Sequence, residues 1–229
     1  MAMDFSKNIY RIISTTFSVI VVVSNIISAK LFALPLFSNF SIPAGLLTYP
    51  LTFLLSDLTT EIFGAKKSRE MVYMAFGMTL LSFAIIQLAL YMPSNDPLNA
   101  QAFKEVFGLN GMIVFSSLAA YAAAQLLDIK LYSYIRFLTG PRFLWVRNNG
   151  STLLSQIADT FIVNSIHLTI GLGMDPSSVL WIMAISYFYK AFVSIAVTPL
   201  FYLLLYLIQK NMNFHEKRFE SAAKKLLKI

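Results

Sequence analysis

The sequence predicts an all-α, polytopic membrane protein with six transmembrane helices. Of its 229 residues 57% are hydrophobic and only 13% are charged, whereas a soluble domain carries about a quarter of its residues as charges. The apolar residues form long runs, each close to the ~20 residues that a helix needs to cross a bilayer. Basic residues gather in alternate connections between these runs, the pattern that orients membrane helices. Cysteine is absent, which excludes disulfides and thiolate metal sites.

The predicted spans together make one transmembrane domain over residues 1–209. They cover residues 10–33, 42–63, 72–92, 111–130, 152–172 and 179–208. The first run lacks a small-residue cleavage pattern and is expected to be a retained helix. The last run is longer than a bilayer requires, so it can tilt, bend or extend past the membrane.

The basic residues predict the orientation of these helices. If the six helices alternate, 15 of the 18 basic residues fall on one side of the membrane. They are Lys7, Arg11, Lys66, Lys67, Arg69, Lys130, Arg136, Arg142, Arg147, Lys210, Lys217, Arg218, Lys224, Lys225 and Lys228. Both termini are therefore expected in the cytoplasm. The net charge of +7 reflects this topology and does not indicate a nucleic-acid surface.

Three segments lie outside the predicted spans. Residues 92–110 are expected to form the main outer loop, with turns at Pro93 and Pro97. Residues 131–149 form a basic, aromatic connector expected along the membrane interface. Residues 210–229 form a basic amphipathic cytoplasmic tail, either an interfacial helix or a frayed end. The sequence contains no phosphate loop, zinc-ligand spacing or nucleophile elbow, so we expect no enzyme, cofactor or metal, and an ATPase would have to be a separate subunit.

Ionisable residues within the apolar runs are the strongest functional signal. Asp57 and Glu61 lie one helical turn apart and share a face. A carboxylate at the centre of a membrane helix costs ~2.5–3.5 kcal/mol, so such groups face the bundle interior and usually have a partner. With no cation within a turn, the two acids favour a functional role. Asp159 and Lys190 fall at similar depth on successive helices, where an ion pair would serve structure or function equally well.

Other polar residues carry weaker signals. Gln125 and Asp128, at the inner end of the fourth run, are interpreted as structural, and a lone His167 as a helix contact. Pro50 and Pro199 are expected to interrupt their helices, as in many transporters. Small side chains in the fourth run allow close helix contact, within the chain or in a homodimer: Ser116, Ala119, Ala120, Ala123 and Ala124.

The two halves of the chain show a short correspondence. The polar segments SDLTTE (56–61) and SQIADT (155–160) stand in equivalent places of the second and fifth runs. Because each half contains three spans, the halves would have opposite orientation, a 3+3 inverted repeat. Carriers of that kind bind their substrate between the halves, near the middle of the membrane.

Three motifs resemble the queuosine precursor transporter family, also called the vitamin uptake transporter family. They are SNIISAK (24–30), AGLLTYPLTFLLSDLTTEIFG (44–64) and RNNGSTLLSQIADT (147–160). The resemblance implies an inner-membrane carrier importing a 7-deazaguanine base (queuine, preQ0 or preQ1) for tRNA modification. Its partners would be that base and the lipid bilayer, without nucleic acid or an ATPase subunit. The matched residues, with Lys190 added for its pairing, give the expected transport path: Asn25, Lys30, Tyr49, Asp57, Glu61, Arg147, Ser155, Gln156, Asp159, Thr160 and Lys190.

The chemistry of such a base fits these residues. Its ring N–H and exocyclic NH2 stand side by side, so one carboxylate, Asp57 or Asp159, can accept both. Gln156 or Asn25 could donate to its carbonyl, and Tyr49, Phe53 or Phe161 could cover its flat face.

Three other functions compete with this one. They are a substrate-binding subunit of an energy-coupling-factor vitamin importer, an intramembrane enzyme with paired carboxylates, and a structural subunit. Proton symport and passive exchange followed by metabolic trapping are equally consistent with the sequence.

Overall fold

The computed structural model shows a helical protein with one short β-hairpin. It describes residues 2–28, 30–34, 37–108, 111–140, 143–166, 173 and 175–226, with side chains over 6–28, 30, 43–108, 117–140, 143–166, 173 and 175–212. The helices are α1 (Ala2–Ile27), α2 (Tyr49–Phe63), α3 (Ala65–Tyr91), α4 (Pro97–Phe107), α5 (Gly111–Thr139), α6 (Leu144–Asn164) and α7 (Pro176–Leu226). Between α1 and α2 lie the antiparallel strands β1 (Leu31–Leu34) and β2 (Phe37–Pro43), then the 3-10 helix η1 (Ala44–Leu47).

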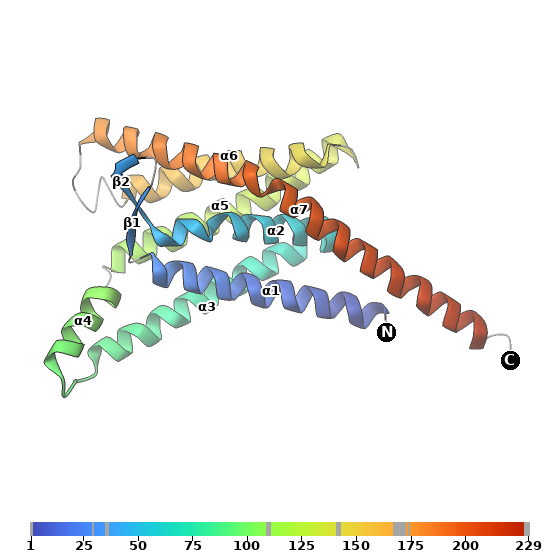
Figure 1. Cartoon of the computed structure of the whole chain (residues 1–229), viewed down its shortest axis with the longest axis horizontal. Coiled ribbons are helices and arrows are strands. Elements are labelled where there is room, and N and C mark those ends of the chain that lie inside the picture. The colour runs from blue at the N-terminus through green and yellow to red at the C-terminus, as the bar shows by residue number, and fades with distance from the viewer. Residues whose placement is uncertain are drawn as a thin grey trace.

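The long helices run in alternate directions along the bundle (Figure 1). Both chain ends, the junction of α2 with α3 and the turn from α5 to α6 lie toward one end. The hairpin, α4 and the start of α7 lie toward the other. Within the described residues, three helices contain stretches long and apolar enough to cross a membrane, namely Ser6–Ile27, Ala65–Tyr91 and Pro176–Met212. This all-α architecture agrees with the predicted class, and α2, α5 and α6 carry most of the buried polar residues.

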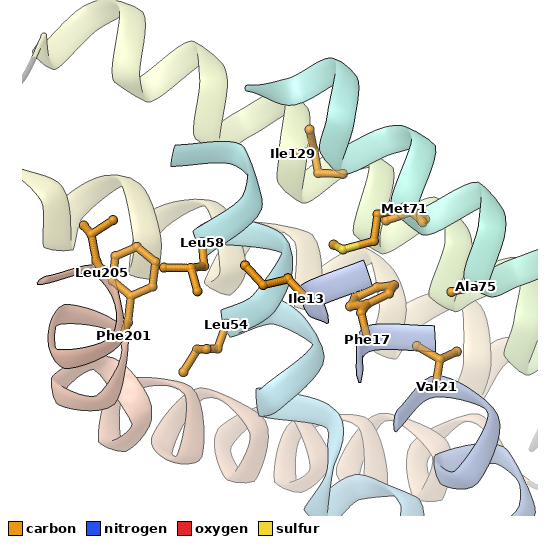
Figure 2. Close-up of a cluster of buried hydrophobic side chains, with 11 residues drawn as sticks. Ile13, Phe17, Val21, Leu54, Leu58, Met71, Ala75, Ile129, Phe201 and Leu205 are labelled. Carbon is orange, nitrogen blue, oxygen red and sulfur yellow. The ribbon is translucent and has the colours of Figure 1, made fainter. Parts of the chain in front are cut away.

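Helix α2 is the central element of the bundle. It contacts α1, α3, α5 and α7, and one side of it is apolar. Figure 2 shows Leu54 and Leu58 of α2 between Ile13 and Phe17 of α1 and Phe201 and Leu205 of α7. Met71, Val72 and Ala75 of α3 extend the same cluster. This cluster holds α2 against its neighbours and leaves its other side for polar contacts with α5 and α6.

Two connecting segments differ from the sequence prediction. The interfacial connector expected over 131–149 is wrong, because α5 continues to Thr139 and α6 begins at Leu144. Buried Tyr132, with none of its surface exposed, shows that the core continues beyond the basic residue that suggested the end of the span. Within the predicted outer loop α4 forms, since the Asp96 side chain accepts hydrogen bonds from the backbone N–H groups of Leu98 and Asn99.

The two prolines lie at different positions in their helices. Pro50 lies in the first turn of α2 and does not interrupt a helix, because the backbone nitrogen of a residue at that position makes no hydrogen bond within the helix. The predicted break at this position is therefore wrong. Pro199 lies inside α7, which continues on both sides of it from Pro176 to Leu226, so the predicted interruption is not found there either.

Some predictions fall on parts that the structure leaves undescribed. The backbone of α7 extends through Leu226, but the side chains of the proposed amphipathic tail beyond Met212 lie outside the described residues, and so does His167. In α5, Ala120 and Ala124 are fully buried within the chain. Their close helix contact is therefore internal.

Candidate functional site

Polar side chains of α2, α5 and α6 face one another in the bundle interior. Most neighbours in each set are about one helical turn apart, which places them on one face of their helix. We call this set the polar seam; it comprises Tyr49, Thr52, Asp57 and Glu61 of α2, Tyr121, Gln125, Asp128 and Tyr132 of α5, and Arg147, Thr152, Ser155, Gln156 and Asp159 of α6. Hydrogen bonds join the three helices, from Gln125 Nε2 to Thr52 Oγ1 at 3.4 Å and from Ser155 Oγ to Asp128 Oδ1 at 3.2 Å.

Asp159 forms a buried ion pair with Lys190 of α7. The Lys190 Nζ lies 2.6 Å from Asp159 Oδ2 and 3.4 Å from the Thr160 hydroxyl. The same ammonium lies 4.7 Å from the centre of the Tyr49 ring, a cation–π contact. The pair predicted from their similar depth is thus confirmed. It connects α6, α7 and the start of α2.

Asp57 and Asp128 form a second buried group, which consists of two acids. Their carboxyl groups are neighbours, and they are 1% and 0% exposed. Within the described part of the chain, neither Asp57 oxygen nor Asp128 Oδ2 makes a hydrogen bond of good geometry, although the Thr152 hydroxyl lies near both acids. No ion pair to either acid occurs among the described residues. These two acids therefore have unused hydrogen-bond acceptor atoms in the protein interior.

Glu61 occupies the end of the seam near the junction of α2 and α3. Arg147 donates to it through two nitrogens, Nη2 to Oε1 at 2.7 Å and Nε to Oε2 at 3.1 Å. The Tyr132 hydroxyl donates to Oε2 at 2.7 Å. Arg136 adds a longer contact at 3.7 Å. Glu61 therefore has the cation that its own helix lacks, and this bidentate pair ties α2 to α5 and α6.

The seam also contains amides and phenols with unused hydrogen-bonding groups. Gln156 is fully buried, and neither its amide nitrogen nor its amide oxygen has a partner. The hydroxyl groups of Tyr49 and Tyr121 also make no hydrogen bond of good geometry with a described residue, although the first lies close to Asp159 and the second close to Thr52 and Gln125. Buried polar groups are nearly always hydrogen-bonded in folded proteins. So many unpaired hydrogen-bonding groups together indicate a binding site for a polar ligand.

A small cavity lies beside Asp57. Its lining includes Phe53, Asn148 and Thr152, and on α7 Ser194 and Thr198. Its volume of about 10 Å³ is at the lower limit for one water molecule, whereas small-molecule pockets usually measure ~300–1,000 Å³. The chamber expected for a planar base is therefore closed beside Asp57 in this conformation.

Seven of the eleven site residues predicted from sequence belong to this seam. Thr160 and Lys190 lie beside it, at the ion pair with Asp159, and two more do not join it. Lys30 is exposed just beyond α1, and the half-buried Asn25 side chain donates to its own helix at Val21 O. Phe161, a candidate ring partner, is 62% exposed on the outer surface. Among the residues whose side chains are described, no three histidine or acidic groups gather as a metal site would require.

Asp128 and Gln125 of α5 are expected at the membrane interface, yet both are fully buried in the seam. Tyr121 and Tyr132, which the sequence analysis does not single out, also belong to the seam. The spacing of positions 121, 125, 128 and 132 marks one polar helix face. Of these four positions, only Tyr132 lies beyond the predicted end of the span at residue 130.

Buried ionisable groups inside an apolar helical bundle define a class, the polytopic membrane transport proteins, in which such residues mark substrate or ion paths. The chain belongs to the family described as "Putative vitamin uptake transporter", whose profile matches residues 43–204. It is therefore a multi-pass membrane transporter and not an enzyme.

Three relatives carry more specific names. A "Probable queuosine precursor transporter" of Bacillus subtilis is 33% identical over 161 residues, 69% of this chain and 69% of its own. A "Queuosine precursor transporter" of Escherichia coli is 29% identical over 174 residues, 73% of this chain and 75% of its own. A "Probable queuosine precursor transporter" of Haemophilus influenzae is 31% identical over 142 residues, 61% of this chain and 58% of its own. No solved structure matches the chain.

Proposed function

We propose that this transporter imports a queuosine precursor, a 7-deazaguanine base such as queuine, preQ0 or preQ1, across the bacterial inner membrane for tRNA modification. The printed names of three relatives support the substrate class. The observation that carries the proposal is the combination of Asp57 and Gln156, two buried side chains of the polar seam whose polar atoms make no hydrogen bond of good geometry with a described residue.

These two residues match the polar edge of the base. Neither Asp57 oxygen makes a hydrogen bond of good geometry with a described residue, so the carboxylate can accept the ring N–H and the exocyclic NH2 together. The Gln156 amide nitrogen can donate to the ring carbonyl. Asp159, the other acid considered, already accepts from Lys190. The difference in pairing favours Asp57 as the acid that recognises the base and gives Asp159 a role in shaping the path.

Aromatic side chains stand near this edge. The Tyr49 and Phe53 rings lie with centres 5.0 Å apart on the same helix, and Phe53 also lines the cavity beside Asp57. We propose that one of these rings covers the flat face of the base after the cavity widens.

We further propose a topology of six spans, α1, α2, α3, α5, α6 and α7, with both termini in the cytoplasm. The alternate directions of these helices (Figure 1) support it. So does the position of Arg136 and Arg147 at the end where the chain termini lie. In this scheme α2 and α6 are the corresponding middle helices of a 3+3 inverted repeat, and the seam lies between the halves.

The test is transport by the purified chain in proteoliposomes. We expect uptake of at least one labelled base from a panel of queuine, preQ0, preQ1 and guanine. Asp57→Asn loses a charge-assisted acceptor worth about 1.5–3 kcal/mol, so uptake should fall by at least about tenfold. Asp175→Asn, the same change at an exposed helix cap, should leave uptake unchanged.

Two outcomes contradict the proposal. One is full uptake by the Asp57→Asn variant, and the other is uptake of none of the deazaguanines by the wild-type chain. Uptake by this chain alone would also contradict the alternative function, a binding subunit that depends on a separate ATPase.

A further inference from the structure

The buried charges of the polar seam do not balance. Glu61 is paired with Arg147 and Asp159 with Lys190, at 2.7 and 2.6 Å. Asp57 and Asp128 are as deeply buried as these groups but form no ion pair within the described part of the chain. Two adjacent carboxylates without a cation would each carry the cost of an isolated charge in an apolar interior.

The elements around Asp57 offer no cation to balance it. On α5 the nearest titratable groups are Asp128 and Tyr132, and on α2 the next is Glu61. Arg147 of α6 is engaged with Glu61 at the end of the seam. The α7 side of the cavity presents the hydroxyl groups of Ser194 and Thr198.

Helices α1 and α3 cover the opposite side of α2 with apolar residues, among them Phe17 and Met71 (Figure 2). Among the described residues, no cationic side chain near Asp57 and Asp128 is therefore available to balance their charge.

The hydrogen bonds of the two acids indicate what kind of ligand balances their charge. Asp128 Oδ1 accepts from the Ser155 hydroxyl, and the Thr152 hydroxyl lies near both acids, but Asp128 Oδ2 and both Asp57 oxygens make no hydrogen bond of good geometry with a described residue. Two neighbouring carboxyl groups can bond to each other only when one of them carries a proton. The adjacent cavity of about 10 Å³ leaves room for one water at most, so a bulky ligand is excluded from this closed conformation.

We propose that the Asp57–Asp128 pair binds a proton in the empty, closed carrier. The proton bonds the two carboxyl groups to each other and removes one of the two unbalanced charges. Protonation forms an O–H bond on one carboxyl oxygen; the proton comes from water when the seam opens and returns to water in the same way.

A consequence for transport follows, and it rests on the proposed function. When a base is bound, its N–H donors occupy the Asp57 oxygens and take the place of the proton. The empty carrier then needs the proton to close, whereas the loaded carrier does not. Net uptake, which requires the empty carrier to return, should depend on pH, and base-for-base exchange should not.

The first experiment is independent of the substrate. Infrared spectra of the purified chain in lipid nanodiscs should contain the C=O stretch of a protonated carboxyl group, shifted in D2O and lost on raising the pH. The band should disappear in Asp57→Asn and in Asp128→Asn and persist in Asp175→Asn. Wild-type protein without this band overturns the proposal, even if Na⁺ stabilises the fold instead, because Na⁺ would then be the bound ion.

The second experiment compares net uptake with exchange at equal pH on both sides of the membrane. For wild-type protein, net uptake should fall by up to about tenfold per pH unit above the transition, as expected for one proton, while exchange stays constant. In Asp128→Asn the amide donates to Asp57 in place of the proton, so net uptake should lose its pH dependence. Net uptake that is independent of pH in the wild type overturns the proposal. Absence of uptake at every pH, with the infrared band present, contradicts only the proposed function.

Discussion

At the scale of single residues, the ion pair of Asp159 and Lys190 shows how burial determines what a charge contributes. The two side chains are 3% and 8% exposed with 2.6 Å between nitrogen and oxygen. On the surface, Lys67 and Glu70 of α3 make a pair of the same length with 49% and 42% exposure. Water solvates the surface charges whether or not they pair, but removing one buried partner leaves the other charge uncompensated.

We predict that Lys190→Met lowers the free energy of unfolding by about 3–5 kcal/mol, because Asp159 is left charged in the interior. The double variant Lys190→Met/Asp159→Asn should recover most of this loss. Thermal melting in detergent measures both effects. As the matched control, Lys67→Met should cause no measurable change. Additive effects of the two buried substitutions would show that the pair is not coupled.

At the scale of elements, α2 is positioned by glycines at both ends. Gly64, with φ of +85°, is the single residue between α2 and α3, a backbone conformation that favours glycine. Before α2, Gly45 of η1 packs directly on α1, where an added Cβ would overlap the Ser28 hydroxyl and the Ser24 carbonyl oxygen. This contact fixes where α2 begins, and with it the depth of Tyr49.

Gly45→Ala should destabilise the protein by about 1–3 kcal/mol, since one of the overlapping atoms belongs to the backbone of α1 and cannot rotate away. Gly77 of α3 provides the control, because nothing lies within 4 Å of its added Cβ. Gly77→Ala should be neutral or stabilising by up to about 1 kcal/mol. Equal melting temperatures for the two variants would contradict the importance of the Gly45 contact.

At the scale of the whole molecule, the long helices alternate in direction (Figure 1), while three of them are identified as membrane spans by length and hydropathy. Helix α2 has only 15 residues, fewer than the ~20 of an ordinary span. This short length keeps α2 out of the three, although residues 42–63 form one of the apolar runs of the sequence. Its polar face contacts other helices and not lipid.

The proposed topology can be tested with single cysteines, because the natural chain contains none. Lys67→Cys, Asn99→Cys and Ser177→Cys place a thiol at exposed positions near α2–α3, in α4 and at the start of α7. A membrane-impermeant thiol reagent applied to intact spheroplasts should label the Asn99 and Ser177 variants only. The Lys67 variant should react only after lysis. Labelling of all three from outside would contradict the six-span scheme.

Part of this site was predictable from sequence. Asp57 and Glu61 share a face of α2 by spacing alone, and the pair of Asp159 with Lys190 followed from depth. The different pairing of Asp57 and Glu61 was not predictable. It depends on α6 beginning at Leu144, which brings Arg147 to Glu61, and on the packing of α5 against α2, which brings Asp128 to Asp57.

By itself the sequence determined the membrane class, the helical architecture and the family, since these depend on the length, hydropathy and order of segments along the chain. Only the tertiary structure decided which buried acids have a cation and which have only each other. For Asp57 and Glu61 that assignment depends on contacts between residues 70 or more positions apart, namely Asp57 with Asp128 and Glu61 with Arg147. Local spacing places side chains on a helix face but does not specify what that face meets.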